Sequence, residues 1–280
     1  MIKESNEYDY IKNERAVYDL LSNQAKTIKK NKDRLYHYTT FESLLYIIQD
    51  RRFRLTRTDL LNDKAEKKIG NTEKASHNYV MSMTEGIEYI SMWAMYGRPS
   101  GIKIRLDFSK EEFIRIINCN NDWSNYNSNV FHRFSVDENG NLIKDTLHKL
   151  FSLNNEPNPI RFAYIAYINK EKKKAKYNNK YFHSLILDEK SIEELTGFVK
   201  YDAWEFEKEI RLLVELKDNA REYIYLPISN DLIKTFRITF NPWISDKMSD
   251  MIKTQLNGLC GFDLKYKSSD NEGEIDETRL

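Results

Sequence analysis

The stretch Trp204-Glu205-Phe206-Glu207-Lys208-Glu209-Ile210-Arg211-Leu212-Leu213-Val214 is the most informative part of the 280-residue chain. We expect a β-strand from Trp204 to Glu215, in which side chains alternate between two faces. One face then carries Trp204, Phe206, Ile210, Leu212 and Val214, and the other carries Glu205, Glu207, Glu209 and Arg211. Buried carboxylates at this spacing need a cation or a hydrogen-bond donor. Two interpretations stay open. The carboxylates either form a binding face, with Arg211, a polyol or a substrate cation as their partner, or they form a solvated face on an edge strand.

Around this stretch, apolar periodicity predicts a mixture of helices and strands. Helices are expected at about 14–32, 41–50, 87–96, 109–118, 189–196 and 245–256, and further strands at 34–39, 53–58, 78–83, 101–108, 160–168, 223–227, 235–240 and 262–267. No strict βαβ order is present, which favours an α+β fold. We expect a single domain over residues 1–267 and a disordered acidic tail at 268–280.

Composition and absent motifs exclude several functional classes. The 44 Lys and Arg residues against 43 Asp and Glu residues give a net charge of +1, so a globally basic nucleic-acid coat is excluded. Two cysteines without a Cys-x-x-Cys pair exclude a zinc ribbon or redox motif, and the five histidines lack metal-ligand spacing. P-loop and Rossmann signatures are missing. The polar first residues and the lack of a long apolar stretch predict a soluble cytoplasmic protein without a membrane segment.

A second motif is Tyr36-His37-Tyr38-Thr39-Thr40, a histidine between aromatic residues on a short strand that leads into a helix. Thr39 and Glu42 form a predicted capping box. Such a junction exposes backbone N–H groups that can face an anion or a ribose, and His37 can donate to a ribose hydroxyl or a phosphate oxygen. The alternative is a core histidine satisfied by the backbone.

Two further features each have a functional and a structural interpretation. Trp93 and Tyr96 are three residues apart on the predicted 87–96 helix, so they either form a wall for a planar ring or pack in the core. The basic runs at 26–34 and 170–176 either hold a phosphate backbone or form solvated faces.

These motifs, in this order, resemble the bacterial family of domain of unknown function 2971. The resemblance runs over about 34–242 and rests on Leu35 to Thr39, on Leu61-Asn62-Asp63, on Met92 to Tyr96 with Gly101, and on the Trp-x-x-Glu-x-Glu-x-Arg element that ends at Arg211. Lys64 departs from the proline that the family usually carries there.

The opening strand, helix and strand also resemble, more distantly, the ADP-ribosyltransferase superfamily, especially its DNA-targeting toxins. This likeness implies a split, mostly antiparallel sheet with flanking helices. It further implies that NAD is the substrate, that His37 binds a ribose hydroxyl of NAD, and that Glu209, with Glu207 in reserve, is the catalytic carboxylate. Trp93 and Tyr96 are candidates for the residues that flank the nicotinamide. Tyr38, Thr39 and Arg211 are further candidates for NAD binding, and the period-two spacing also places Arg211 where it can hold Glu209.

We therefore expect an NAD-dependent ADP-ribosyltransferase that modifies a nucleic acid or a protein, of the kind found among toxins and phage-defence effectors, with an antitoxin or another defence protein as a partner. No metal is expected. The first alternative is a metal-dependent nuclease, indicated by Asp188-x-Lys190 together with Glu207 and Glu209. The second is a non-catalytic module that senses a nucleotide.

Overall fold

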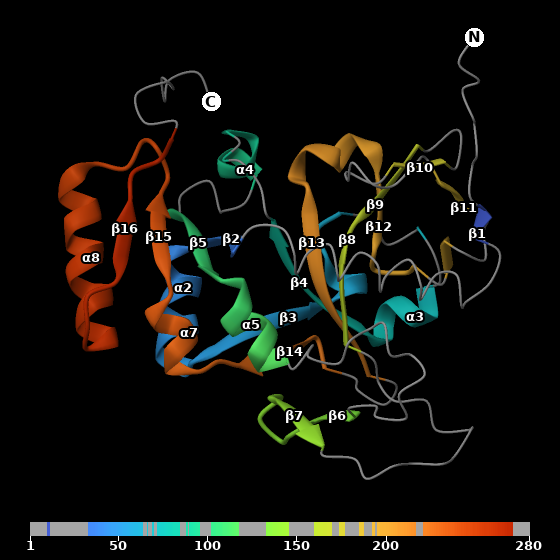
Figure 1. Cartoon of the computed structure of the whole chain (residues 1–280), viewed down its shortest axis with the longest axis horizontal. Helices are drawn as coiled ribbons and strands as arrows, with labels where there is room; N and C mark the ends of the chain where they lie inside the picture. The colour runs from blue at the N-terminus through green and yellow to red at the C-terminus, as the bar shows by residue number, and fades with distance from the viewer. Residues whose placement is uncertain are drawn as a thin grey trace. The chain divides into compact units, whose positions relative to one another are not determined.

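A computed structural model of the chain describes residues 10–11, 33–63, 66, 69, 72–84, 88, 90–95, 102–117, 133–145, 160–169, 174–176, 185–187, 192–193, 195–216 and 221–270. The fold is α+β, with strands that pair mostly antiparallel and helices that flank them, as predicted (Figure 1). The described residues group into two compact units. The first unit comprises the described residues within 1–30, 55–82 and 121–224, and the second comprises those within 31–54, 83–120 and 225–280. The single domain of the sequence analysis stays a prediction, and the helix expected at 14–32 lies outside the described residues.

The first unit contains a five-stranded sheet, a second group of paired strands and a two-stranded hairpin. The sheet has the order β1 (Tyr10–Ile11), β11 (Leu185–Leu187), β10 (Lys174–Lys176), β9 (Ala166–Asn169) and β12 (Val199–Tyr201). Strand β13 (Glu209–Glu215) pairs with β4 (Asn78–Thr84) and antiparallel with β8 (Ile160–Tyr164). Helix α3 (Thr72–His77) leads into β4, and β6 (Arg133–Val136) and β7 (Leu142–Asp145) form a hairpin. The predicted strand at 160–168 is divided between β8 and β9 at Ile165.

Apolar residues from β4, β8, β9, β12 and β13 form the core of the first unit. Ala163, Ile165, Leu195, Phe198 and Leu213 are all fully buried in it. Burying side chains of this kind contributes about 1.5–3 kcal/mol for each large one, which is the main favourable term for folding.

The predicted strand from Trp204 to Glu215 is wrong in its first part. Asp202–Glu207 form a 3₁₀ helix, Lys208 has left-handed backbone (φ 45°), and the strand begins at Glu209. A left-handed residue interrupts the pleat, so the period-two alternation does not extend back to Trp204. The interpretation as a solvated edge strand is also wrong, because β13 has partners on both sides and its residues up to Val214 are buried.

Four strands of the second unit pair side by side. β2 (Arg34–Thr40) pairs antiparallel with β5 (Lys103–Ser109), β5 pairs antiparallel with β15 (Arg237–Phe240), and β15 pairs parallel with β16 (Lys265–Lys267). The helices are α2 (Phe41–Asp50), α4 (Ile90–Met95), α5 (Lys110–Ile117), α7 (Asn230–Lys234) and α8 (Asp246–Cys260). Strands β3 (Arg52–Arg57), β4 and β14 (Tyr223–Pro227) each run from one unit into the other along the chain.

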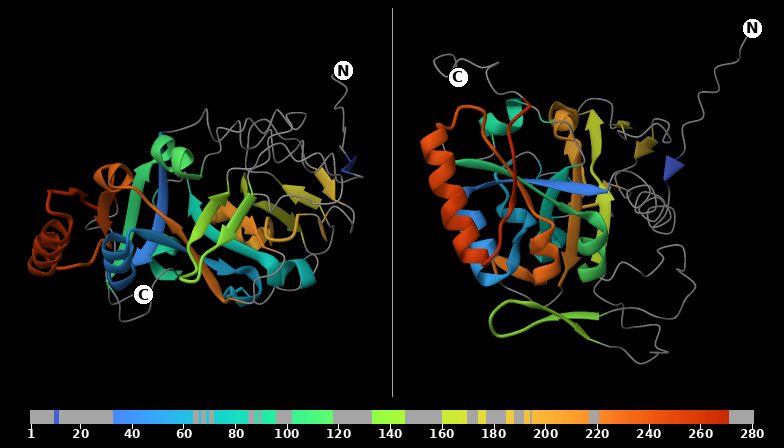
Figure 2. Two further views of the ribbon diagram at one scale, coloured as in Figure 1. Left: turned by 90° about the horizontal axis from the view of Figure 1, so that it is seen from below. Right: turned by 60° about the vertical axis from the view of Figure 1, so that its left-hand side comes forward.

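Aromatic packing holds the second unit together. The ring of Phe53 lies 5.3 Å from that of Phe108 and 6.2 Å from that of Phe113 on α5, and Phe236 packs against the first two. Helices α2, α5 and α7 contact β5, and α8 packs against α2 (Figure 2). The cap of α2 is Thr40, which accepts a hydrogen bond from the backbone N–H of Ser43, so the cap predicted at Thr39 is one residue early.

Candidate functional site

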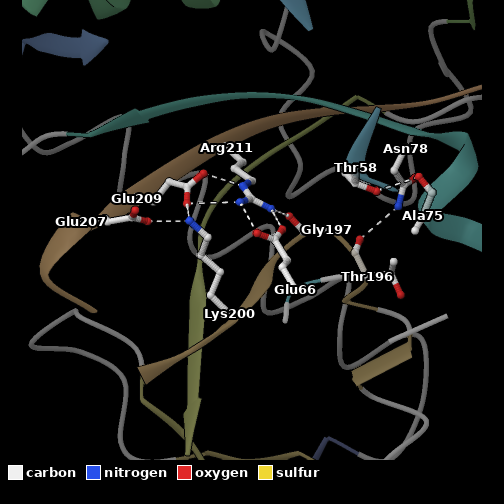
Figure 3. A network of polar contacts seen from close by, with 10 residues as sticks. All are labelled: Thr58, Glu66, Ala75, Asn78, Thr196, Gly197, Lys200, Glu207, Glu209 and Arg211. Atoms are coloured by element: carbon white, nitrogen blue, oxygen red, sulfur yellow. Dashed lines mark hydrogen bonds and ion pairs between the residues drawn. The ribbon is translucent and has the colours of Figure 1, made fainter. Parts of the chain in front are cut away.

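Arg211 is the centre of a buried polar network in the first unit (Figure 3). Its Nε donates to Glu209 Oε1 at 2.5 Å, and its Nη2 lies 3.3 Å from Glu209 Oε2. Its Nη1 and Nη2 bind the carboxylate of Glu66 in a fork, with a distance of 3.0 Å from Nη2 to Oε2, and Nη1 also donates to the carbonyl of Gly197 at 2.8 Å. Guanidinium has five N–H donors, and these contacts use all of its nitrogen atoms. At 1% exposure, Arg211 is a fully enclosed link between two carboxylates.

Lys200 extends this network to a third carboxylate. Its Nζ lies 2.6 Å from Glu207 Oε2 and 2.8 Å from Glu209 Oε2. Lys208 separates the two glutamates and has a left-handed backbone, and both carboxylates contact the same ammonium group. The five charged side chains of the network therefore carry one formal negative charge: Glu66, Lys200, Glu207, Glu209 and Arg211. We call this set the carboxylate cluster.

The electrostatics of the carboxylate cluster keep Glu209 ionised. Burial alone raises the pKa of the Glu209 carboxyl, but the charges of Arg211 and Lys200 and their hydrogen bonds outweigh burial and lower this pKa to about 2. Burial lowers the pKa of Arg211, whereas Glu209 and Glu66 raise it well above its usual value. The pKa of Lys200 is also raised, because its carboxylate neighbours outweigh burial.

Backbone geometry positions the carboxylate cluster. Gly197 has a left-handed backbone (φ +88°), and a Cβ at this position would lie 2.5 Å from Leu213 Cδ1. Only glycine fits there without strain, and this turn directs the Gly197 carbonyl toward Arg211. On the other side, the backbone N–H of Glu209 donates to the Tyr167 hydroxyl at 2.9 Å. Burial raises the pKa of that hydroxyl, so it stays protonated.

A second buried network lies in the second unit. Trp93 Nε1 donates to Glu88 Oε1 at 2.7 Å, and Arg105 Nη1 lies 3.2 Å from Glu88 Oε2. The ring of Tyr38 meets that of Trp93 edge-on at 5.1 Å. The Arg105 guanidinium lies over the ring of Tyr36 at 5.1 Å. Glu88 thus connects the aromatic residues of β2 with a buried cation of β5.

The predicted residues of β2 are divided between the two faces of its sheet. His37 is opposite Leu106 and contacts Phe53, with ring centroids 6.3 Å apart. Tyr38 is opposite Arg105 and points toward Trp93. Because neighbouring strand residues alternate, His37 and Thr39 share one face and Tyr38 lies on the other. The side chains of His37, Tyr38 and Thr39 therefore do not all lie on the same face of the sheet.

The structure brings together three of the predicted residues, Glu207, Glu209 and Arg211, within the first unit. His37 belongs to the second unit, so a cleft shared by His37 and Glu209 stays a prediction. Trp93 is fully buried with its N–H bonded to Glu88, and its role as a ring wall stays a prediction. Tyr96 lies outside the described residues.

Other predicted features fall partly outside the described residues. Of the basic run at 170–176, Lys174–Lys176 form β10, and of the run at 26–34 only residues 33–34 are described. The Asp188-x-Lys190 motif of the nuclease alternative is not among the described positions. In the part of the chain that the structure describes, no group of three or more His, Cys, Asp and Glu side chains is arranged to hold a metal ion.

Sequence reasoning missed Lys200 and Glu66 in the first unit and Glu88 in the second. Lys200 lies on β12, seven residues before Glu207. It follows the apolar pair Phe198-Val199, which is the sequence feature that could have indicated a lysine in a buried strand. Glu66 follows the Asn62-Asp63 loop, a segment without periodicity. Nothing in the sequence alone indicates that it faces Arg211.

The family comparison identifies a segment that contains four of the five residues of the carboxylate cluster, all except Glu66. Residues 92–212 match the model of a family described as "Protein of unknown function (DUF2971)". The matched segment is similar to this family and contains Trp93 and the Trp-x-x-Glu-x-Glu-x-Arg element. The match is shorter than the predicted range of 34–242, and the strand with His37 lies outside it. No curated protein and no solved structure matches the chain.

None of the helices in the described part of the chain combines the length and the apolar content needed to span a bilayer.

Proposed function

We propose that this protein transfers ADP-ribose from NAD to a macromolecule. The observation that carries the proposal is the ionised carboxylate of Glu209 in a buried cluster with one formal negative charge. Cleavage of the nicotinamide–ribose bond develops positive charge on the ribose. A fixed negative charge beside that ribose stabilises the transition state more than the ground state.

In the proposed reaction, the bond between C1′ of the ribose and the ring nitrogen of nicotinamide breaks, and its electron pair leaves with neutral nicotinamide. A nucleophile of the target then forms a bond to C1′ and loses its proton. Glu209 acts as the charge stabiliser, and Arg211 and Lys200 hold it in its ionised form. The step needs no metal.

The second unit supplies the features that support nucleotide binding. β2 leads directly into the capped helix α2, with His37 and Thr39 half-buried on one face and Tyr38 on the other. In the proposal, His37 anchors a ribose hydroxyl, as the superfamily resemblance implies, and Tyr38 and Trp93 are the aromatic neighbours.

A second candidate, nucleotide binding without chemistry, is favoured by one specific observation. The two carboxylate oxygens of Glu209 already receive three donors, two from Arg211 and one from Lys200. A carboxylate can accept about four hydrogen bonds, so one position is left for a substrate hydroxyl. In the transferase proposal, this position receives a hydroxyl of the ribose.

The test is incubation of the purified protein with NAD labelled in the adenylate part, with and without a bacterial lysate and with and without EDTA. The transferase proposal predicts label on a macromolecule and release of nicotinamide, both insensitive to EDTA. Binding of NAD without release supports the sensing function. Degradation of nucleic acid that EDTA abolishes supports the nuclease.

The biological setting belongs to the same proposal. We propose that the protein acts in the cytoplasm, where NAD is available, as a toxin or phage-defence effector, with a nucleic acid or a protein as its target and an antitoxin or another defence protein as a partner. The lysate experiment identifies the chemical class of the target, because nuclease and protease treatments remove the label selectively.

A further inference from the structure

One face of the sheet in the second unit is both buried and charged. On β5, Lys103, Arg105 and Asp107 alternate with Ile104, Leu106 and Phe108, and all of them are buried. Alternation of this kind is typical of a half-buried strand, which has one solvated face. Instead, the charged face of β5 lies against the aromatic residues of β2 and against α4.

Two buried cations lie on this face, Arg105 and Lys103, and Glu88 is the carboxylate that pairs with Arg105. Arg105 is 3% exposed, and its Nη2 has only a long contact of 3.5 Å to Thr239 Oγ1. Its buried Nε has no hydrogen-bond partner among the described residues. Lys103 is 8% exposed, and its Nζ donates to the carbonyl of Ala94 at 3.2 Å, with no carboxylate within ion-pair distance in the described part of the chain.

The buried positive charges of Arg105 and Lys103 favour the binding of an anion. A buried cation is costly unless it is paired, and burial accordingly lowers the pKa of the Lys103 ammonium. Glu88 offsets one of the two charges through its contact with Arg105 Nη1. The remaining charge and the open Nε of Arg105 are complementary to a phosphate.

The C-terminal segment places hydrogen-bond donors on the same network. The hydroxyl of Ser269 donates to Glu88 Oε1, and the backbone N–H of Asp270 donates to Glu88 Oε2 at 3.1 Å. The carboxylate of Asp270 forms an ion pair with Lys267 at 2.8 Å. The hydrogen bond from Lys267 lowers the pKa of Asp270, and the positive charge of Arg105 contributes to this lowering.

Ser269 thus presents a hydroxyl to the Glu88 carboxylate, and the neighbouring Asp270 carries an anion on the same segment. A ribose phosphate presents the same two groups. The segment was predicted to be part of a disordered tail, but Ser269 is buried at this network, whereas residues 271–280 lie outside the described residues.

We propose that Glu88, Arg105 and Lys103 form a binding site for the ribose hydroxyl and phosphate of a nucleotide, and that Ser269–Asp270 occupies this site as a displaceable strap. A ligand must compete with the strap. The apparent association constant is therefore the intrinsic constant multiplied by the fraction of molecules in which the strap is displaced. The choice of NAD and its fragments as the nucleotide rests on the proposed function.

The test compares two full-length double variants. In Ser269→Ala/Asp270→Ala, the strap loses its side-chain contacts with Glu88 and Lys267. The matched control is Ser249→Ala/Asp250→Ala on α8, which is also a Ser-Asp pair whose aspartate is paired with a lysine three residues away. Among the described residues, this pair makes no contact with Glu88 or Arg105.

Calorimetric titration with ADP-ribose and, separately, with inorganic pyrophosphate measures the effect. We expect the strap variant to bind ADP-ribose about tenfold more tightly than the wild type, with the control unchanged. Hydrogen exchange of the unmodified protein gives a second readout, in which saturating ADP-ribose accelerates exchange of the Asp270 amide that Glu88 holds.

The inference is overturned if the strap variant binds ADP-ribose no more tightly than the control, or if ADP-ribose leaves the Asp270 amide exchange unchanged. A gain for pyrophosphate alone overturns the assignment to a nucleotide. Failure of the proposed function gives a different result: the strap effect on ADP-ribose binding is present, but NAD is not cleaved.

Discussion

Replacement of Arg211 by methionine removes the centre of the carboxylate cluster. The substitution keeps much of the apolar volume but deletes every N–H donor that binds Glu66, Glu209 and the Gly197 carbonyl. Glu209 keeps the ion pair with Lys200 at 2.8 Å, whereas Glu66 loses the only ion pair that it makes among the described residues.

The expected cost follows from this unequal loss. Removal of one partner from a buried ion pair typically destabilises a protein by about 3–5 kcal/mol, because the remaining charge stays buried without compensation. We therefore expect Arg211→Met to lower the free energy of unfolding by about 3–5 kcal/mol. That amount is comparable to much of the total stability of an ordinary domain.

Urea denaturation followed by far-ultraviolet circular dichroism measures this loss as a shift of the midpoint. The control is Arg115→Met on α5, where the arginine pairs with Glu111 and Glu112 but is largely exposed. Exposed ion pairs of this kind contribute about 1 kcal/mol or less. Addition of Glu66→Met to the Arg211→Met variant should restore at least about 1 kcal/mol. An Arg211→Met variant that is no less stable than the Arg115→Met control refutes the reasoning.

Three further predictions follow from the same structure. The pKa of Glu209 is lowered from 4.5 to about 2, so its ionisation stabilises the fold by about 3 kcal/mol above about pH 4.5. Acid titration should show that the wild type loses this contribution as the pH falls toward 2, whereas Glu209→Gln has no such contribution to lose. Gly197→Ala should lower the free energy of unfolding by about 1–3 kcal/mol in urea denaturation. The control is Gly258→Ala, whose Cβ meets nothing within 4 Å and which should stabilise α8 by about 0.5–1 kcal/mol. Equal denaturation midpoints for the two variants contradict the steric argument. His37→Ala should weaken NAD binding by a few kcal/mol at most and leave the melting temperature close to that of the wild type; unchanged affinity with a large loss of melting temperature means that His37 is structural.

Local patterns predicted most elements of the second unit closely. The helix at 41–50 agrees with α2 at both ends, and the strand at 223–227 agrees with β14. These segments have clear caps or alternation, so local propensity and tertiary packing agree. The strand predicted at 101–108 was found as β5, although its charged face is buried.

The predictions that failed depend on contacts distant in sequence or on unusual backbone. The left-handed residue Lys208 interrupts the expected strand, and nothing in its side chain signals that conformation. The period-two argument still paired Glu209 with Arg211, because both lie within the true strand. It missed Glu66 because that contact joins residues 145 positions apart, which only the fold determines.

The most direct test of the central claim is NAD cleavage by the Glu209→Gln variant. The amide keeps the shape of the side chain but removes the charge that is proposed to stabilise the ribose. We predict that release of nicotinamide falls by about two orders of magnitude or more relative to the wild type, the scale of losing one electrostatic stabiliser, while NAD affinity stays within a few-fold. Cleavage by Glu209→Gln at the wild-type rate would contradict the role of Glu209, and absence of cleavage by the wild type would contradict the transferase itself.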